Sequence, residues 1–461
     1  METVPPELRQ RLQAANQSHV LDAWPNLSAA DRQTLAHHLE SLDLDQLARL
    51  YRQRDEQCAV PTDDRIAPIA ATTPMAGDRK VGEEALRRGE VAVLIVAGGQ
   101  GTRLGFDHPK GMFGIGPVRG TSLFQILAER TLAMQRRYGK SIPFLVMTSP
   151  ATHDETVAYF EQHQHFGLPR DEVTFFQQGT MPALELTTGK LLMESPSRLF
   201  LSPNGHGGCL LALADQGILD RLCQRGIRHI FYCQVDNPLV LVADPLFLGH
   251  HIQAKAEVST KVIPKEGPLD KLGNLVLIDG RCGIIEYSDL PERLARLTDA
   301  DGQLRFRFGN SAIHIFDVEF LKRVSTGDLR IPFHVARKKV PHVNEQGEQV
   351  EPTKENALKF ELFIFDVLPR AERWTVVETQ RAAEFHPVKN ASGTDSPQSV
   401  RLAMSNRAGD WLEQAGIAVP RLPNRNVSVP LEISPLFALD ADEVKKKIDP
   451  KMGITDSKYF G

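Results

Sequence analysis

The sequence has few cysteines and lacks any segment that would direct the chain into a membrane or a secretory route. Its five cysteines among 461 residues form no CxxC pair and no zinc-ligand spacing, which argues against a disulfide framework and a structural zinc site. The N-terminus METVPPELRQ contains no apolar core of a signal peptide, and no run is long enough to cross a bilayer. No long basic run accompanies the formal net charge of -4, which argues against general nucleic-acid binding. We therefore expect a cytoplasmic protein with neither a membrane nor a nucleic acid as its partner.

The length of the chain predicts more than one domain. A single hydrophobic core rarely grows to this size, and the content of 41% hydrophobic and 24% charged residues is ordinary for a globular protein. Residues 1–57 have helical apolar spacing and contain nothing that chemistry would need. We expect a helical N-terminal segment over 1–57, a catalytic domain over 58–400 and a small C-terminal domain over 401–461.

The order of predicted elements indicates an α/β fold. Short apolar strands alternate with amphipathic helices from residue 91 onward, which predicts a mostly parallel sheet with helices on both faces. The expected strands span 91–97, 144–147, 173–177 and 230–235, and the expected helices span 121–137, 150–163 (capped by Ser149) and 207–224. An antiparallel insertion is expected at about 258–290, after which 311–316 and 375–379 return to the main sheet.

A glycine-rich loop follows the first of these strands. The apolar run Val91–Ala97 ends in Gly98 and Gly99, and Arg103 and Lys110 come soon after. Glycines let backbone N–H groups approach a ligand closely, and cations beside them suit a polyphosphate. The loop is not a Walker motif, because no Gly-Lys-Ser/Thr follows, and its GxGxxxG spacing differs from the dinucleotide fingerprint. A turn that binds nothing would need neither cation.

A carboxylate follows another predicted strand. Asp236 comes directly after the buried run that ends at Val235, so we expect it at the ligand-binding edge of the sheet. Mg²⁺ prefers one or two carboxylates together with phosphate oxygens, which makes Asp236 a candidate metal ligand. The alternative is an aspartate that caps a turn, because Asp-Asn-Pro is turn chemistry.

Nine short motifs, from about Val91 to Lys389, give the chain a family resemblance. They are AGGQGTRLG (97–105), PKGM (109–112), FFQQG (175–179), GHGG (205–208), VDN (235–237), EYSD (286–289), GN (309–310), FELFIFD (360–366) and PVKN (387–390). In this order they resemble the eukaryotic-type UDP-sugar pyrophosphorylases, most of all the UDP-N-acetylglucosamine branch. The resemblance implies a mixed, mostly parallel, Rossmann-like (GT-A-like) nucleotidyltransferase sheet. It also implies that UTP and a sugar 1-phosphate are converted, with Mg²⁺, to a UDP-sugar and pyrophosphate.

The resemblance also implies roles for individual residues. The phosphate-neutralising, catalytic cations would be Arg103, Lys110 and Lys389. The nucleotide would be held by Val96, Ala97, Gly98, Gly99, Lys110, Gln178, Gly205, Asp236 and Lys359, with Asp236 also binding the metal. The sugar would be met by His206, Glu286, Tyr287, Asn310, Phe363, Phe365 and Lys389.

Each implied role has a structural alternative. The alternative for Gln178 is a polar strand end, for Glu286 a solvent-facing strand residue, and for Lys359 and Lys389 surface lysines. Phe363 and Phe365, two residues apart, are expected on one face of an extended segment, where they would line either a ligand pocket or the core.

His206 departs from the N-acetylglucosamine branch, which usually carries Asn between these glycines, whereas the glucose branch carries His. We predict N-acetylglucosamine 1-phosphate as the acceptor, with glucose 1-phosphate as the alternative. A non-catalytic protein that binds a UDP-sugar is a third hypothesis, although such a protein would not need transition-state cations.

Overall fold

The computed structural model describes residues 3–55, 61–326, 331–344 and 347–461. The chain consists of two compact units. Unit 1 consists of Met1–Val60, Gln178–Gly208 and Ile331–Ile364, and unit 2 of Pro61–Gln177, Cys209–Arg330 and Phe365–Gly461. The N-terminal segment therefore shares a unit with two stretches that lie within the range we expected for the catalytic domain.

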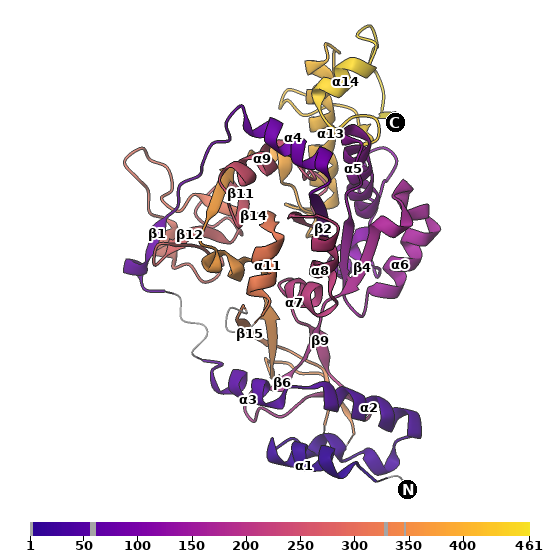
Figure 1. Ribbon diagram of the computed structural model, residues 1–461, viewed down its shortest axis with the longest axis vertical. Helices are drawn as coiled ribbons and strands as arrows, with labels where there is room; N and C mark the ends of the chain where they lie inside the picture. The colour runs from indigo at the N-terminus through magenta and orange to yellow at the C-terminus, as the bar shows by residue number, and fades with distance from the viewer. Residues whose placement is uncertain (1–2, 56–60, 327–330, 345–346) are drawn as a thin grey trace. The chain divides into compact units, whose positions relative to one another are not determined.

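Unit 2 is built on a 10-stranded sheet in the order β1-β12-β14-β10-β2-β3-β4, with β11 pairing with β14 and β19, and β13 pairing with β12 (Figure 1). The strands are β1 (Ile66–Pro68), β2 (Val91–Val96), β3 (Phe144–Thr148), β4 (Val173–Gln177), β10 (His229–Gln234), β11 (Val258–Pro264), β12 (Asn274–Ile278), β13 (Arg281–Ile285), β14 (Phe308–Asp317) and β19 (Trp374–Glu378). The α/β class and the mixed sheet expected from the sequence are confirmed.

The half of this sheet formed by β10, β2, β3 and β4 is parallel. Val96 at the end of β2 pairs with Gln234 on one side and Met147 on the other, so the carboxyl ends of these strands meet at one edge. The expected run of apolar residues in β2 is buried on both faces. Side chains from α4 (Asp78–Arg88), α5 (Leu123–Tyr138), α6 (His153–Gln162) and α9 (Pro245–Gln253) join its core cluster.

The remaining strands of the sheet are mainly antiparallel. β14 runs antiparallel to both β10 and β11, while β11 pairs in parallel with β19. β12 and β13 form a hairpin whose turn, Asp279-Gly280, has positive φ at both residues (50° and 75°). This backbone suits the Asp-Gly dipeptide that predicted the turn.

Two details of the predicted helices are wrong. Ser149 does not cap a helix: α6 begins at His153, and the backbone N–H of Ser149 donates to the Thr152 hydroxyl instead. The helix expected over 207–224 is divided into α7 (Gly208–Asp215) and α8 (Ile218–Gln224). Gly217 lies between them with φ 65°, a left-handed conformation that ends an α-helix.

The C-terminal part of unit 2 has a hydrophobic cluster of its own. Its elements are α13 (Pro397–Gln414), β20 (Leu431–Ile433), α14 (Ala441–Lys447) and β21 (Lys458–Phe460), with β20 and β21 paired in parallel. α13 begins with a capping box in which the Ser396 hydroxyl accepts from the Ser399 backbone. The short helices α10 (Glu292–Ala295), α11 (Val318–Val324) and α12 (Arg381–Glu384) complete unit 2.

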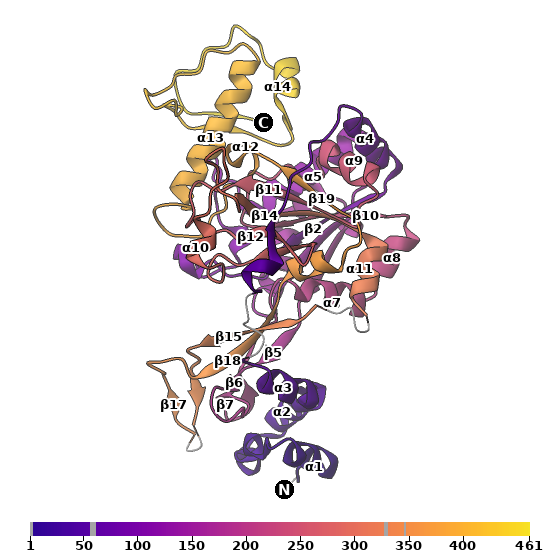
Figure 2. The same ribbon diagram turned by 90° about the vertical axis from the view of Figure 1, so that its left-hand side faces the viewer.

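Unit 1 combines helices with small sheets, and Figure 2 shows β15 and β18 lying side by side. Its elements are α1 (Pro6–Ala14), α2 (Ala29–Ser41), α3 (Leu44–Arg52), β5 (Thr180–Pro182), β6 (Leu184–Glu185), β7 (Met193–Ser195), β8 (Arg198–Leu199), β9 (Leu201–Pro203), β15 (Phe333–Lys338), β16 (His342–Val343), β17 (Gln349–Val350) and β18 (Ala357–Leu362). Leu35 and Leu47 of the helices share one core cluster with Leu358 and Phe360 of β18. Within the described ranges, no helix has the length and apolar character needed to cross a membrane.

Candidate functional site

The loop after β2 folds back on itself and brings Lys110 beside the glycines. The backbone N–H of Gly101 donates to the carbonyl of His108 (2.9 Å), and that of Lys110 donates to the carbonyl of Gly99 (3.0 Å). The N–H of Ala97 still donates to Met147 of β3 (2.8 Å), so the loop leaves the sheet immediately afterwards. Backbone hydrogen bonds thus bring Lys110, eleven residues after Gly99, beside the glycines of the loop.

Different physical causes explain why glycine occupies each of these positions in the loop. A Cβ on Gly101 would lie 2.8 Å from the carbonyl oxygen of Phe106, and one on Gly111 would lie 2.2 Å from the Phe124 ring. A Cβ on Gly99 would meet no atom within 4 Å. Packing inside the protein therefore explains Gly101 and Gly111, whereas the open space at Gly99 is available for a ligand to approach the backbone.

Lys110 and Asp236 meet at the carboxyl edge of the parallel strands. The Lys110 Nζ lies 3.3 Å from Asp236 Oδ2, and Asp236 is only 8% exposed. Their ion pair joins the loop after β2 to the loop after β10, as expected for neighbouring parallel strands. Arg103 lies on the same loop but is exposed, and no ion pair within the described ranges involves it. The structure brings two of the three expected groups into contact and leaves the third on the loop surface.

The loop that carries Asp236 is tied to the segment that carries Lys389. The backbone N–H of Val388 donates to the carbonyl of Asp236 (2.9 Å). The side-chain amide of Asn237 donates to the carbonyl of Glu384 (2.7 Å), and its oxygen accepts from the His386 backbone (3.2 Å). The candidate metal ligand and the candidate phosphate-binding lysine therefore belong to one hydrogen-bonded assembly.

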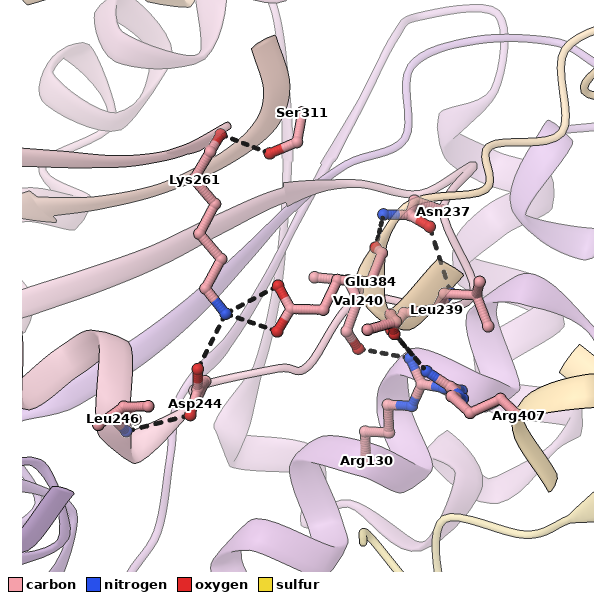
Figure 3. A network of polar contacts seen from close by, with 11 residues as sticks. Arg130, Asn237, Leu239, Val240, Asp244, Leu246, Lys261, Ser311, Glu384 and Arg407 are labelled. Carbon is pink, nitrogen blue, oxygen red and sulfur yellow. Dashed lines mark hydrogen bonds and ion pairs between the residues drawn. The ribbon is translucent and has the colours of Figure 1, made fainter. Parts of the chain in front are cut away.

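A buried lysine links the same two segments (Figure 3). The Lys261 Nζ of β11 lies 2.6 and 2.8 Å from the Glu384 carboxylate oxygens and 2.8 Å from Asp244 Oδ2. Burial disfavours the charge on Lys261, but Asp244 and Glu384 outweigh burial and raise its pKa. Burial raises the pKa of Glu384, and Lys261 opposes that shift. One ammonium thus neutralises carboxylates from the Asp236 loop and from the Lys389 segment.

Sequence reasoning did not identify Lys261 or Glu384 as part of the site. The two residues are 123 positions apart, and neither belongs to a motif that points to chemistry. Glu384 lies shortly before the PVKN motif, and that proximity is the one signal by which it could have been found.

Asp395 is a second carboxylate near Asp236 that the sequence did not single out. Its backbone carbonyl accepts from the Lys389 N–H (2.7 Å). Burial raises the pKa of Asp395, the charge of Lys389 lowers it, and the charge of Asp236 raises it further. The backbone carbonyls of Asp236 and Asp395 thus accept from consecutive residues, Val388 and Lys389, of the PVKN motif.

Asn310 lies at an irregularity of the sheet. The register between β11 and β14 shifts after Lys261, so that Val262 pairs with Asn310 and Lys261 with Ile313. Ala312 has a positive φ of 55°, and its N–H donates to Asn310 Oδ1 (2.9 Å). Bulges of this kind redirect side chains and occur next to active sites, which is compatible with the predicted sugar contact of Asn310.

The EYSD motif follows β13 in unit 2. The carbonyl of Glu286 accepts from the N–H groups of Asp289 and Leu290, both at 3.0 Å, so the motif forms a turn. Tyr287 is 48% exposed, and with Asn274 it lines a cavity of about 340 Å³. This cavity provides room beside Tyr287 for a small ligand, whereas the predicted grip of Glu286 on sugar hydroxyls stays a prediction.

The expectation for Phe363 and Phe365 is wrong in its geometry. β18 ends at Leu362, and a 3₁₀ helix begins at Ile364, so the two rings do not share one face of an extended segment. Phe363 belongs to unit 1 and Phe365 to unit 2. Phe365 is only 6% exposed, which fits core packing.

Gln178, Gly205, His206 and Lys359, four further predicted residues, lie in unit 1. Gln178 is buried, and Gly205 has a φ of 84° with its backbone so near Leu362 that a Cβ would lie 2.5 Å from that carbonyl oxygen. Lys359 on β18 lies over the Phe200 ring, with its Nζ 4.9 Å from the centroid, and burial lowers its pKa. Lys359 is therefore packed and not a free surface lysine.

His206 is held as a neutral imidazole. Its Nδ1 accepts from the backbone N–H of Ile364 (3.2 Å), and its ring stacks on Phe363 with centroids 5.4 Å apart. Burial lowers its pKa to about 4, and the nearby charge of His334 adds to the effect. Since Nδ1 accepts, the ring proton resides on Nε2.

Comparisons with known proteins agree with the motifs. The family model described as UTP–glucose-1-phosphate uridylyltransferase (UDPGP) matches residues 47–430. The UDP-N-acetylglucosamine pyrophosphorylase of Saccharomyces cerevisiae is 36% identical over 431 residues, covering 88% of this chain and 90% of the yeast protein. The UDP-N-acetylglucosamine diphosphorylase 2 of Arabidopsis thaliana is 37% identical over 476 residues, covering 95% of this chain and 90% of the plant protein.

A solved structure gives the same picture. The crystal structure of the uridine diphosphate N-acetylglucosamine pyrophosphorylase from Trypanosoma brucei, in complex with an inhibitor, superposes with a TM-score of 0.80 at 27% identity. The match covers 97% of this chain and 95% of the trypanosome chain. The resemblance drawn from the motifs is confirmed, and the chain belongs to the UTP–glucose-1-phosphate uridylyltransferase (UDPGP) family.

Proposed function

We propose that the protein is a uridylyltransferase that forms UDP-N-acetylglucosamine and pyrophosphate from UTP and N-acetylglucosamine 1-phosphate. The observation that carries the proposal is the meeting of Lys110 and Asp236, 3.3 Å apart, beside a glycine loop at the carboxyl edge of parallel strands. Relatives that carry this activity in their names, at 36% and 37% identity, support the choice of acceptor.

The reaction requires charge neutralisation more than proton transfer. A phosphate oxygen of the sugar 1-phosphate attacks the α-phosphorus of UTP, a new P–O bond forms, and the bond to pyrophosphate breaks. The attacking oxygen is already ionised at neutral pH, so no general base is needed, and repulsion between anions dominates the barrier. Lys110, Arg103 and the open backbone at Gly99 would receive the nucleotide phosphates, and Lys389 the sugar phosphate.

The donor set fits Mg²⁺ bound together with the nucleotide. The residues described contain no group of three or more His, Cys, Asp or Glu side chains able to hold an ion by themselves. Asp236 offers one carboxylate of the one or two that Mg²⁺ uses when phosphate oxygens complete its shell. When bound, the ion supplies positive charge to the transferring phosphate. Lys110, released from Asp236, would then be available to the same phosphates.

The state of the cysteines bears on the cellular location. Cys209, Cys223, Cys233 and Cys282 are free thiols, and Cys58 lies outside the described residues. Unpaired thiols suit a reducing compartment, so we propose that the enzyme works in the cytoplasm.

Glucose 1-phosphate is the second candidate acceptor, and His206 favours it. The deciding experiment incubates UTP with a panel of hexose and hexosamine 1-phosphates, with Mg²⁺ and with EDTA, and measures pyrophosphate release. We expect Mg²⁺-dependent release with N-acetylglucosamine 1-phosphate at a higher kcat/KM than with glucose 1-phosphate. Release with none of the acceptors would support a non-catalytic UDP-sugar-binding protein instead.

A further inference from the structure

A cavity of about 110 Å³ in unit 2 has an unusual concentration of arginines. It lies among α4, α5, α13 and the chain between Leu241 and Pro245, away from the glycine loop. Four arginines and two aspartates line it: Arg79, Arg130, Arg137, Arg407, Asp244 and Asp440. We refer to this cavity as the arginine pocket.

The acidic side chains of the arginine pocket are already engaged. Asp440 lies 2.8 Å from Arg137, which also pairs with Glu443, and Asp244 lies 2.8 Å from Lys261. No carboxylate in the described part of the chain forms an ion pair with Arg79, Arg130 or Arg407. The charge of Glu384 acts on both Arg130 and Arg407, but Glu384 also pairs with Lys261. In the lining itself, four guanidinium groups therefore face two carboxylates, one already paired with Arg137 and the other with Lys261.

Arg130 and Arg407 meet only neutral acceptors. An Nη1–H of Arg130 donates to the carbonyl of Val240 (2.5 Å), and an Nη1–H of Arg407 donates to the carbonyl of Leu239 (2.7 Å) (Figure 3). The Arg407 guanidinium also lies over the Trp411 ring at 5.3 Å. Each guanidinium has further N–H donors beyond these bonds. Burial of a cation without an adjacent counter-ion is costly. Burial, together with the neighbouring Arg407 charge, lowers the pKa of Arg130, and the charge of Glu384 only partly opposes that shift.

We propose that the arginine pocket binds a doubly charged tetrahedral oxyanion, namely free phosphate or sulfate. Planar guanidinium forks match the oxygen pairs of such an ion. The cavity of about 110 Å³ has room for a single oxyanion. Because Arg130 and Arg407 hold the carbonyls of Leu239 and Val240, a bound anion would also fix the chain that follows Asp236. The site does not depend on the proposed reaction.

The test measures binding of inorganic phosphate to the full-length protein by isothermal titration calorimetry. A Lys110→Met background removes a cation of the glycine loop, and sodium chloride at matched ionic strength controls for screening. We expect one phosphate per chain, with sulfate competing. Arg79→Ser, an exposed change that leaves the core intact, and Arg407→Lys, which keeps the charge but loses the fork, should each weaken binding about tenfold or more.

The matched control is Arg136→Ser, an exposed arginine on α5 that does not line the pocket. This variant should bind phosphate as the background does. Absence of binding in the background would overturn the proposal, as would binding that is equal in all variants. Retained folding of Arg79→Ser, checked by its thermal transition, ensures that a loss of binding reports on the pocket.

Discussion

The two sides of the candidate site are built differently. On the nucleotide side, the loop 97–113 is closed by a few local backbone bonds, Arg103 is exposed, and a Cβ on Gly99 would meet open space. On the other side, the loop of Asp236 is held by the backbone N–H of Val388 and by the buried Lys261. The side chain of Asn237 also holds it, through both its amide N–H and its amide oxygen. The difference indicates that the protein fixes the loop of the candidate metal ligand Asp236 in advance and leaves the proposed phosphate-binding loop to be completed by the ligand.

Replacement of Asp236 should have the largest effect on turnover. We expect Asp236→Asn to lower kcat by about 10³-fold or more, since a carboxylate-held divalent ion contributes several kcal/mol to the transition state. The measurement is steady-state pyrophosphate release at saturating UTP. Asp410→Asn, at a carboxylate 58% exposed on α13, should stay within about twofold of wild type. If Asp236→Asn kept more than a tenth of the wild-type turnover, Asp236 would not be the metal ligand.

Loss of Lys261 should break the pre-formed side directly. Lys261→Met leaves the Asp244 and Glu384 carboxylates buried without a counter-ion, and we expect the free energy of unfolding to fall by about 3–5 kcal/mol. Chemical denaturation measures this change. Lys322→Met, which removes a surface ion pair with Asp220, should cost less than about 1 kcal/mol. Equal costs for the two variants would show that Lys261 does not organise these loops.

Arg103 should behave in the opposite way, with a large effect on rate and little on folding. Because its side chain is exposed and forms no ion pair in the described structure, Arg103→Ala should change the free energy of unfolding by less than about 0.5 kcal/mol. Its kcat should fall about 10²- to 10³-fold if it meets charge that develops in the transition state. Binding of the UDP-sugar, measured by calorimetry, should weaken much less. A protein that only binds the ligand would have no turnover to lose.

His206 should contribute a smaller, pH-dependent effect on stability. Its pKa falls from 6.5 to about 4 on folding, so the unfolded chain takes up the proton first as the pH falls. The stabilisation is complete above pH 6.5 and is lost as the pH falls toward 4. Between about pH 7 and pH 5, wild type should lose about 2 kcal/mol more than His206→Asn. Activity profiles above pH 6.5 should be parallel, because the ring is neutral there.

Local sequence signals predicted the parallel half of the sheet well. The apolar run of β2, the glycines after it and the aspartate after β10 lie within a few residues of the predicted positions, because burial and turn chemistry act locally. The common ligand-binding edge of Lys110 and Asp236 was predicted, but their ion pair depends on β2 and β10 being neighbours, an order that was not predicted. The resemblance to the UDPGP family, which rested on the order of the motifs, is confirmed.

The contacts that support the Asp236 loop could not be predicted from local sequence patterns. Nothing near Lys261 in the chain indicates that Glu384 neutralises it, and an apolar strand with one lysine usually places that lysine in solvent. The shift of register opposite Asn310 depends on pairing between two strands, not on either strand alone. The division of 178–208 and 331–364 from unit 2 likewise depends on contacts between segments distant in sequence.

The reverse reaction tests the central claim most directly. Purified protein, UDP-N-acetylglucosamine, labelled pyrophosphate and Mg²⁺ should yield labelled UTP and N-acetylglucosamine 1-phosphate in equal amounts, and Lys110→Met should lower that rate at least about a hundredfold. Absence of labelled UTP from the wild-type protein, with the sugar nucleotide demonstrably bound, would contradict the account.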